Sequence, residues 1–179
     1  MRGIEDRIKK LATLTGVVLM ATAEALAQDW VGRPSRKVVI SIPDRKLAVI
    51  DGDRVVRIFD TAVGAAHSPS PTGTYKIISS VEDPTWYHNG RTVPPGPHNP
   101  LGTRWLGLSA KGYGIHGTNV PSSIGRSASH GCIRMRNRDV EQLFHMVAVG
   151  DRVELLGERT PESARIFAGP AQTAGDNNN

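Results

Sequence analysis

From Lys37 onwards, frequent turn signals divide the sequence into short runs rich in β-branched residues, and this pattern constrains the fold most strongly. Residues 37–64 contain three such runs, separated by Pro43-Asp44 and by Asp51-Gly52. An Asp-Gly pair between two such runs predicts a β-hairpin, because both residues tolerate positive φ angles. Nineteen glycines and twelve prolines among 179 residues also favour many turns over a helix bundle. We therefore predict a mostly β domain, built as a sandwich or a barrel.

The same pattern continues to residue 157, interrupted by one loop and one helix. Further strands are predicted at residues 74–81, 103–110 and 151–157. Residues 84–101 contain five prolines and are predicted to form a long loop, of a kind that is usually functional or mobile. Residues 137–149 are predicted to form a helix that ends at Gly150, because their apolar side chains follow the i, i+3, i+4, i+7 spacing of one helix face. These apolar residues are Val140, Leu143, Phe144 and Val147.

Residues 1–27 show the ordered features of an export signal. Basic residues precede an uncharged stretch at residues 11–23, and Ala25-Leu26-Ala27 then gives a small-x-small cleavage pattern. The stretch is too short for a bilayer-spanning helix, although an uncleaved anchor or a core helix remains an alternative. We predict a signal peptide at 1–27, a linker at 28–36, one domain at 37–157 and a disordered tail at 158–179. Such a protein is exported to the periplasm or the cell envelope.

The formal net charge of +5 does not indicate a nucleic-acid partner. Lysine and arginine are scattered, without a basic run and without stacking aromatic residues among them. An exported basic protein could meet an anionic envelope surface, and an ordinary solvated surface explains the charge equally well. The charge alone does not decide between them.

The chain has one cysteine, Cys132, so it cannot form an internal disulfide. In an oxidising compartment an unpaired cysteine is buried and inert, paired between chains, or a working thiol. The residues around it favour the last possibility, because His116 and His130-Gly131 offer a base and close backbone donors. Two alternatives stay open at this point: a structural cysteine beside structural histidines, and a metal site. Zinc normally needs three or four ligands, and no nearby carboxylate or second cysteine completes the set.

The aromatic residues near this region allow two interpretations. Trp86 and Tyr87 belong to the long loop, where they either line a groove for a sugar-peptide polymer or fill the core. Trp105 lies in a predicted strand, and we expect it in the core.

The segment from Tyr113 to Asp139 resembles the catalytic motif of the L,D-transpeptidase family (YkuD-type, ErfK/YbiS-like). The chain reads IHGTN at residues 115–119 and SHGCIRM at residues 129–135, which matches a histidine followed by Ser/Thr-His-Gly-Cys. The resemblance also includes PTGTY at 71–75 and NPLG at 99–102, and covers residues 37–156. Some members carry Asn two residues after the cysteine, where this chain has Arg134. The resemblance implies a β-sandwich-like catalytic domain with its main helix after the cysteine, packed on one edge.

The resemblance also implies how the motif residues act. Cys132 is expected to attack the carbonyl between an L-centre and a D-residue in a peptidoglycan stem tetrapeptide, with His116 as acid and base. The carbonyl of Gly117 is expected to orient His116, as a carboxylate does in other triads. The N–H groups of Gly131 and Cys132 are candidates for the oxyanion hole.

Three further roles follow from the same resemblance. Ser129 and His130 are expected next to the reacting atoms, and Arg134 near a carboxylate of the substrate. Ser129 and Arg134 have an alternative role, which is to brace the turn. No cofactor and no metal are implied.

The implied function is an exported enzyme that remodels peptidoglycan through a thioester. The expected partners are peptidoglycan stem peptides, with an envelope lipoprotein as a further acceptor, and no stable protein partner or nucleic acid. Two alternatives are an L,D-carboxypeptidase that uses water and a non-catalytic wall-binding module of the same fold. A pure binder has no need of a base beside a thiol, and a redox protein would need a second, resolving cysteine.

Overall fold

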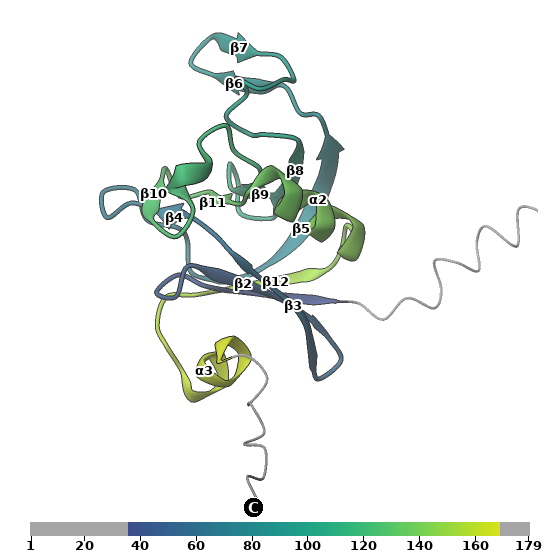
Figure 1. The fold of residues 1–179 in the computed structure, drawn as a ribbon, viewed down its shortest axis with the longest axis vertical. Helices are drawn as coiled ribbons and strands as arrows, with labels where there is room; N and C mark the ends of the chain where they lie inside the picture. Colours follow the sequence, from purple (N-terminus) through teal and green to yellow (C-terminus); the bar gives the residue numbers. More distant parts are fainter. Residues whose placement is uncertain (1–35, 169–179) are drawn as a thin grey trace, which may run out of the picture. The chain divides into compact units, whose positions relative to one another are not determined.

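The computed structural model describes residues 36–168, so the predicted signal peptide and residues 28–35 and 169–179 lie outside the described residues. Figure 1 shows how the elements follow one another. The main strands are β1 (Lys37–Ser41), β2 (Lys46–Asp51), β3 (Arg54–Asp60), β5 (Gly73–Glu82), β8 (Arg104–Leu108), β9 (Gly114–His116), β11 (Ile133–Arg134) and β12 (Arg152–Leu156). The shorter elements are β4 (Val63–Gly64), β6 (Trp86–His88), β7 (Arg91–Val93), β10 (Ser127–Ser129), the 3-10 helix η1 (Pro121–Ser123), and the helices α2 (Asn137–Met146) and α3 (Pro161–Phe167).

One long strand, β5, joins the two halves of the main sheet. Its first residues pair with β12, whereas the residues from Ile77 onwards pair with β8. The register shifts between Ile77 and Ser79, as at a β-bulge, which lets a strand bend between two pairing partners. The hydrogen-bonded order is β11-β9-β8-β5-β12-β1-β2-β3, so β5 stands between three strands on one side and four on the other. The prediction of a mostly β fold is confirmed.

The hairpin predicted from Asp51-Gly52 is present between β2 and β3. Asp51 pairs with Arg54, so the turn residues are Gly52 and Asp53. Gly52 has a φ of +57°, a conformation that glycine adopts at low cost.

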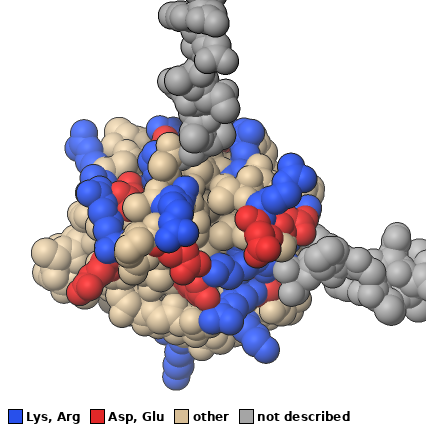
Figure 2. All heavy atoms as spheres, turned by 90° about the horizontal axis from the view of Figure 1, so that it is seen from below, with Lys and Arg blue, Asp and Glu red and all other residues tan. Residues whose placement is uncertain are grey.

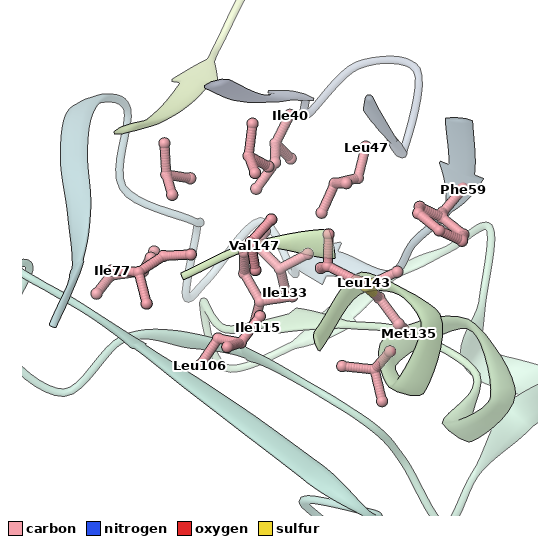
Figure 3. Close-up of a cluster of buried hydrophobic side chains, with 14 of the residues drawn as sticks. Ile40, Leu47, Phe59, Ile77, Leu106, Ile115, Ile133, Met135, Leu143 and Val147 are labelled. Carbon is pink, nitrogen blue, oxygen red and sulfur yellow. The ribbon is translucent and has the colours of Figure 1, made fainter. Parts of the chain in front are cut away.

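Helix α2 closes the core over the strands that carry the motif. Val140 and Leu143 are fully buried, Val147 just beyond the helix is nearly so, and Phe144 is half-buried at the margin. The helix packs against β8 and β9, and Figure 3 shows Leu143 close to Ile133 and Met135. The apolar face predicted for this helix is therefore confirmed. Its burial holds the segment after Cys132 against the sheet by the hydrophobic effect.

The predicted end of this helix is wrong by three residues. The helix stops at Met146, and Val147 is already extended, with a φ of −118°. The carboxylate of Asp151 accepts a hydrogen bond from the Ala148 N–H at 2.8 Å, which favours a turn over another helical residue. Gly150 has a φ of +101°, but it belongs to that turn and donates its N–H to the Ile77 carbonyl.

The predicted disordered tail is also wrong at its start, because α3 forms there. Thr160 and Ser163 make a reciprocal capping box, and Pro161 occupies the first helical turn. Arg159 just before the helix pairs with Asp44 at 2.6 Å, which ties this segment to the β1–β2 turn. Local capping chemistry, which the sequence contains, outweighs the polar composition here.

The long loop predicted at residues 84–101 contains a small hairpin of β6 and β7. Its turn is Asn89-Gly90, and both residues have positive φ. Asn99, whose side chain is fully buried, fastens this segment. Its amide nitrogen donates to the carbonyls of Pro84 at 2.7 Å and Val93 at 3.1 Å, and its oxygen accepts from the Leu101 N–H at 2.8 Å.

Acidic and basic side chains are mixed on the face shown in Figure 2, where blue and red groups lie beside one another. Ion pairs among the described residues include Arg152–Glu154 at 2.9 Å and Lys37–Glu154 at 3.1 Å. Within residues 36–168, no helix is long and apolar enough to span a membrane.

We predict that Asn99→Ala lowers the free energy of unfolding by about 2–4 kcal/mol, because it leaves several buried backbone groups without a partner. Urea unfolding monitored by circular dichroism measures this change. Asn119→Ala is the control, because the Asn119 amide is exposed and, among the described residues, makes one bond, to the His98 carbonyl at 3.0 Å. A loss of equal size in both variants would show that Asn99 does not anchor the hairpin.

Candidate active site

A pocket of about 1000 Å³ contains the two residues that the sequence singles out for chemistry, His116 and Cys132. The β6–β7 hairpin contributes Trp86, Tyr87 and His88 to its lining. Further lining residues near the motif are Leu101, Trp105, Ser129, His130 and Arg134. The pocket therefore joins the motif to the proline-rich segment, which lies far from it along the chain.

His116 ends strand β9, and its ring is held at one nitrogen. Its Nδ1 lies 2.6 Å from the Gly117 carbonyl oxygen. A carbonyl only accepts hydrogen bonds, so the proton sits on Nδ1 and the lone pair of the neutral ring is on Nε2. Trp105 stacks on the imidazole, with 5.7 Å between the ring centroids. The side chain is thus fixed in the tautomer of a general base.

Burial keeps His116 neutral. Loss of solvation lowers the pKa of His116 to about 4, and the charge of Arg134 acts in the same direction, whereas the hydrogen bond to Gly117 opposes both. His116 is only 5% exposed, which accounts for the dominance of desolvation. At neutral pH the ring is a free base.

Cys132 lies in a tight turn between β10 and β11. The Ser129 hydroxyl spans this turn, because it accepts a hydrogen bond from the Gly131 N–H at 3.0 Å and donates to the Cys132 carbonyl. Gly131 has a φ of +106°, and a Cβ there would lie 2.5 Å from the ring of Tyr113. The Ser-His-Gly-Cys motif is thus a local structure in which the serine and the glycine are required by geometry.

The Cys132 thiol is also neutral. Burial raises its pKa, against a smaller opposing effect from a backbone hydrogen bond with Gly114 and from the charge of Arg134. Its sulfur lies 3.8 Å from the Gly112 carbonyl oxygen, and within the described residues no hydrogen bond joins it to His116. The pair is therefore a thiol and an imidazole, rather than a thiolate and an imidazolium.

Arg134 lies directly beside His116, because β11 pairs with β9 in parallel and places these two residues in register. Its backbone is fixed by two hydrogen bonds with Ala62, at 2.8 and 2.9 Å. Arg134 lines the same pocket as Cys132. The site thus contains a positive charge near a neutral thiol and a neutral imidazole.

One predicted role does not fit the hydrogen bonding of the turn. The Gly131 N–H already donates to Ser129, so it is not free to act as an oxyanion donor. Ser129 lines the pocket and braces the turn. Its position is therefore compatible with both expected roles, a place next to the reacting atoms and support of the turn. His130 borders the pocket and meets His67 edge to face, with 6.5 Å between the ring centroids.

Sequence reasoning did not assign three contacts of this site. Trp105, expected in the core, is half-buried and forms a wall against His116. Trp86 stacks on His88, with 5.5 Å between their centroids, and both face the pocket. The third is the anchoring of the hairpin by Asn99. The Asn89-Gly90 pair could have revealed the hairpin, whereas the stacking partner of Trp105 depends on strand register.

Among residues 36–168, no group of three or more His, Cys, Asp or Glu residues is arranged to hold a metal ion.

The sequence has relatives among known proteins. A family model described as the L,D-transpeptidase catalytic domain (YkuD) matches residues 35–155. YqjB of Bacillus subtilis is 39% identical over 122 residues, which cover 65% of this chain and 68% of the relative. YkuD of Bacillus licheniformis is 40% identical over 119 residues, or 66% of this chain and 64% of the relative. YbiS of Escherichia coli K12 is 34% identical over 159 residues, or 80% of this chain and 51% of the relative. The match thus spans between half and about two thirds of these relatives.

Solved structures agree in fold. An L,D-transpeptidase from Mycobacterium tuberculosis H37Rv superimposes with a TM-score of 0.58 at 21% identity, covering 69% of this chain and 58% of the other. A mutant of the Enterococcus faecium L,D-transpeptidase gives a TM-score of 0.58 at 22% identity, covering 68% and 50%. The resemblance inferred from the motif is confirmed. With a family match over residues 35–155, this chain belongs to the YkuD family of L,D-transpeptidase catalytic domains.

Proposed function

We propose that this protein is an exported L,D-transpeptidase that remodels peptidoglycan by acyl transfer from a stem tetrapeptide to an amine. One observation supports this most directly: Cys132 and a His116 ring locked as a neutral base border the same pocket. The acceptor amine is supplied by a second stem peptide, giving a cross-link between third residues, or by an envelope lipoprotein.

Acylation begins with both groups neutral. As the Cys132 sulfur attacks the carbonyl carbon before the terminal D-residue, its proton passes to Nε2 of His116. The positive charge that forms on the ring is stabilised by the Gly117 carbonyl at 2.6 Å. The same proton then moves to the departing amine, the C–N bond breaks, and a thioester on Cys132 remains.

The second half of the reaction reverses these transfers. The acceptor amine gives a proton to Nε2 of His116 as its nitrogen attacks the thioester carbonyl. The C–S bond breaks, and the sulfur recovers the proton. The N–H of Cys132 is the donor that we propose for the oxyanion, because the Gly131 N–H is engaged with Ser129.

Arg134 is the group that we propose to bind the donor's terminal carboxylate. Its guanidinium is the positive charge next to His116 and Cys132, and a planar fork of donors matches a carboxylate. A carboxylate bound there also offsets the positive charge that lowers the pKa of His116. The aromatic walls formed by Trp86 and Trp105 suit the less polar faces of a sugar-peptide chain.

Incubation with disaccharide-tetrapeptide is expected to give a thioester adduct on wild-type protein and release of D-alanine. Cys132→Ala should give neither, because the chain has no other sulfur nucleophile of this kind. Intact-mass spectrometry and amino-acid analysis measure both products, with and without an added stem-peptide amine. A cross-linked dimer indicates transfer to the amine, whereas tripeptide alone indicates hydrolysis. Equal release by wild type and Cys132→Ala would rule out Cys132 as the nucleophile.

The pH dependence of acylation and alkylation should show that Cys132 and His116 are both neutral in the free enzyme. The acylation kcat/KM is expected to fall on the acid side only near pH 4, where His116 gains a proton, and to stay level through pH 6.5. Alkylation of Cys132 by iodoacetamide should rise only above about pH 8.5, the usual pKa of a free thiol, because burial raises this pKa. An alkylation pKa below 7 would contradict this, since it would indicate a thiolate–imidazolium pair.

Arg134→Gln is expected to reduce kcat/KM for acylation by about 10- to 100-fold, the effect of losing a hydrogen bond to a charged group. The loss should be smaller with a donor that ends in a carboxamide, because wild type and Arg134→Gln then both lack the interaction with a terminal carboxylate. Arg138→Gln is the control, since its side chain is 77% exposed. An unchanged loss with the amidated donor would assign Arg134 a purely structural role.

A further inference from the structure

We infer that Asn137 is a positioning residue for His116, acting through the peptide group between Gly117 and Thr118. The inference rests on the proposed function of His116 as the base. Asn137 lies outside the pocket lining and is the first residue of α2. Its side chain nevertheless reaches the backbone that follows His116.

The peptide group between Gly117 and Thr118 is held at both ends. Its carbonyl oxygen, from Gly117, accepts the hydrogen bond of His116 Nδ1 at 2.6 Å. Its N–H, from Thr118, donates to Oδ1 of Asn137 at 3.0 Å. In a trans peptide the C=O and N–H groups point in opposite directions within one plane, so holding the N–H fixes the direction of the carbonyl.

The result is a continuous chain of polar groups from Asn137 to the reactive ring. Each hydrogen bond in such a chain polarises the next, so the Asn137 oxygen makes the Gly117 carbonyl a better acceptor. The better acceptor favours the proton on Nδ1 of His116, which leaves Nε2 free to take a proton from the thiol.

Close packing fixes the position of the Asn137 amide. A Cβ on Gly102 or on Gly117 would overlap with Oδ1 of Asn137, so both positions need glycine for the amide to fit. Gly102 has a φ of +64° and donates its N–H to the Asn99 carbonyl at 3.0 Å. The amide oxygen therefore has little freedom to move away from the Thr118 N–H.

The amide does not serve its own helix. Asparagine near a helix start usually caps the exposed N–H groups. Here the cap residue is Arg136, and α2 has no side-chain cap bond. The side chain of Asn137 is directed to the His116 strand instead, which favours a role in the site over a role in helix stability.

Two variants test the inference by separating the hydrogen bond from the charge. Asn137→Ala removes the acceptor. Asn137→Asp keeps an acceptor oxygen but adds a negative charge, which should raise the pKa of His116 above its wild-type value. Gln142→Ala is the matched control on the same helix, because within residues 36–168 its side chain bonds only to the exposed Arg57, at 3.2 Å.

The first readout is ¹⁵N NMR of His116 in the full chain without substrate, which reports the tautomer and the pKa. Asn137→Ala should broaden or lose the Nδ1–H signal, Asn137→Asp should raise the His116 pKa, and Gln142→Ala should change neither. If Asn137→Ala fails to fold, the pKa in Asn137→Asp decides. Wild-type tautomer and pKa in the folded variants would overturn the inference, even if their melting temperatures fall.

The second readout is the single-turnover rate of Cys132 acylation. Asn137→Ala should slow this rate by about 10- to 100-fold with little change in KM. Such a loss is part of the rate enhancement that a positioned acid–base group supplies. If the wild type is not acylated at all, the proposed function fails, while the NMR measurement still tests the positioning of His116. A rise in KM with an unchanged rate would overturn the inference.

Discussion

The parallel pairing of β9 with β11 is the contact on which the site depends. It sets Arg134 beside His116 and Ile133 beside Ile115, and the Met135 N–H extends it by donating to the His116 carbonyl at 2.8 Å. Because Cys132 immediately precedes β11, this register brings the Cys132 thiol and the His116 imidazole to one cavity although they lie sixteen positions apart in the sequence. The buried isoleucines of both strands, covered by α2, stabilise the pairing from the core side.

Burial acts in opposite directions on the two groups that this pairing brings together. It lowers the pKa of the imidazole and raises the pKa of the thiol, since each loses the solvent that would stabilise its charged form. The same environment therefore keeps both groups neutral. The nearby guanidinium of Arg134 favours a thiolate and disfavours an imidazolium, so it does not stabilise the ion pair as a whole.

Local patterns in the sequence predicted much of this structure. The β-branched runs, the Asp51-Gly52 hairpin and the apolar face of the helix after residue 137 rest on neighbouring residues alone. The capping residues before α3 and the Asn89-Gly90 turn were also readable, but composition suggested a tail and a loop there. The pairing of Trp105 with His116 and the bonds of Asn99 could not be predicted, because their partners are set by strand register and by contacts between distant segments.

The same limit applies to the site. The motif identified Cys132 and His116, and the family match supports the fold around them. The motif did not show that the Gly131 N–H is hydrogen-bonded to Ser129, because this bond depends on the geometry of the turn. Nor did it show the neutral state of the pair, because a pKa depends on burial that only the folded chain defines.

The protonated state of Cys132 has a consequence for the oxidation of this thiol. Peroxides and disulfides react with a thiolate far faster than with a thiol. Burial that raises the pKa of Cys132 therefore disfavours the thiolate from which sulfenic acid forms, and this sequence contains no second cysteine with which it could pair. The same burial that keeps the sulfur protonated therefore also limits its reaction with oxidants.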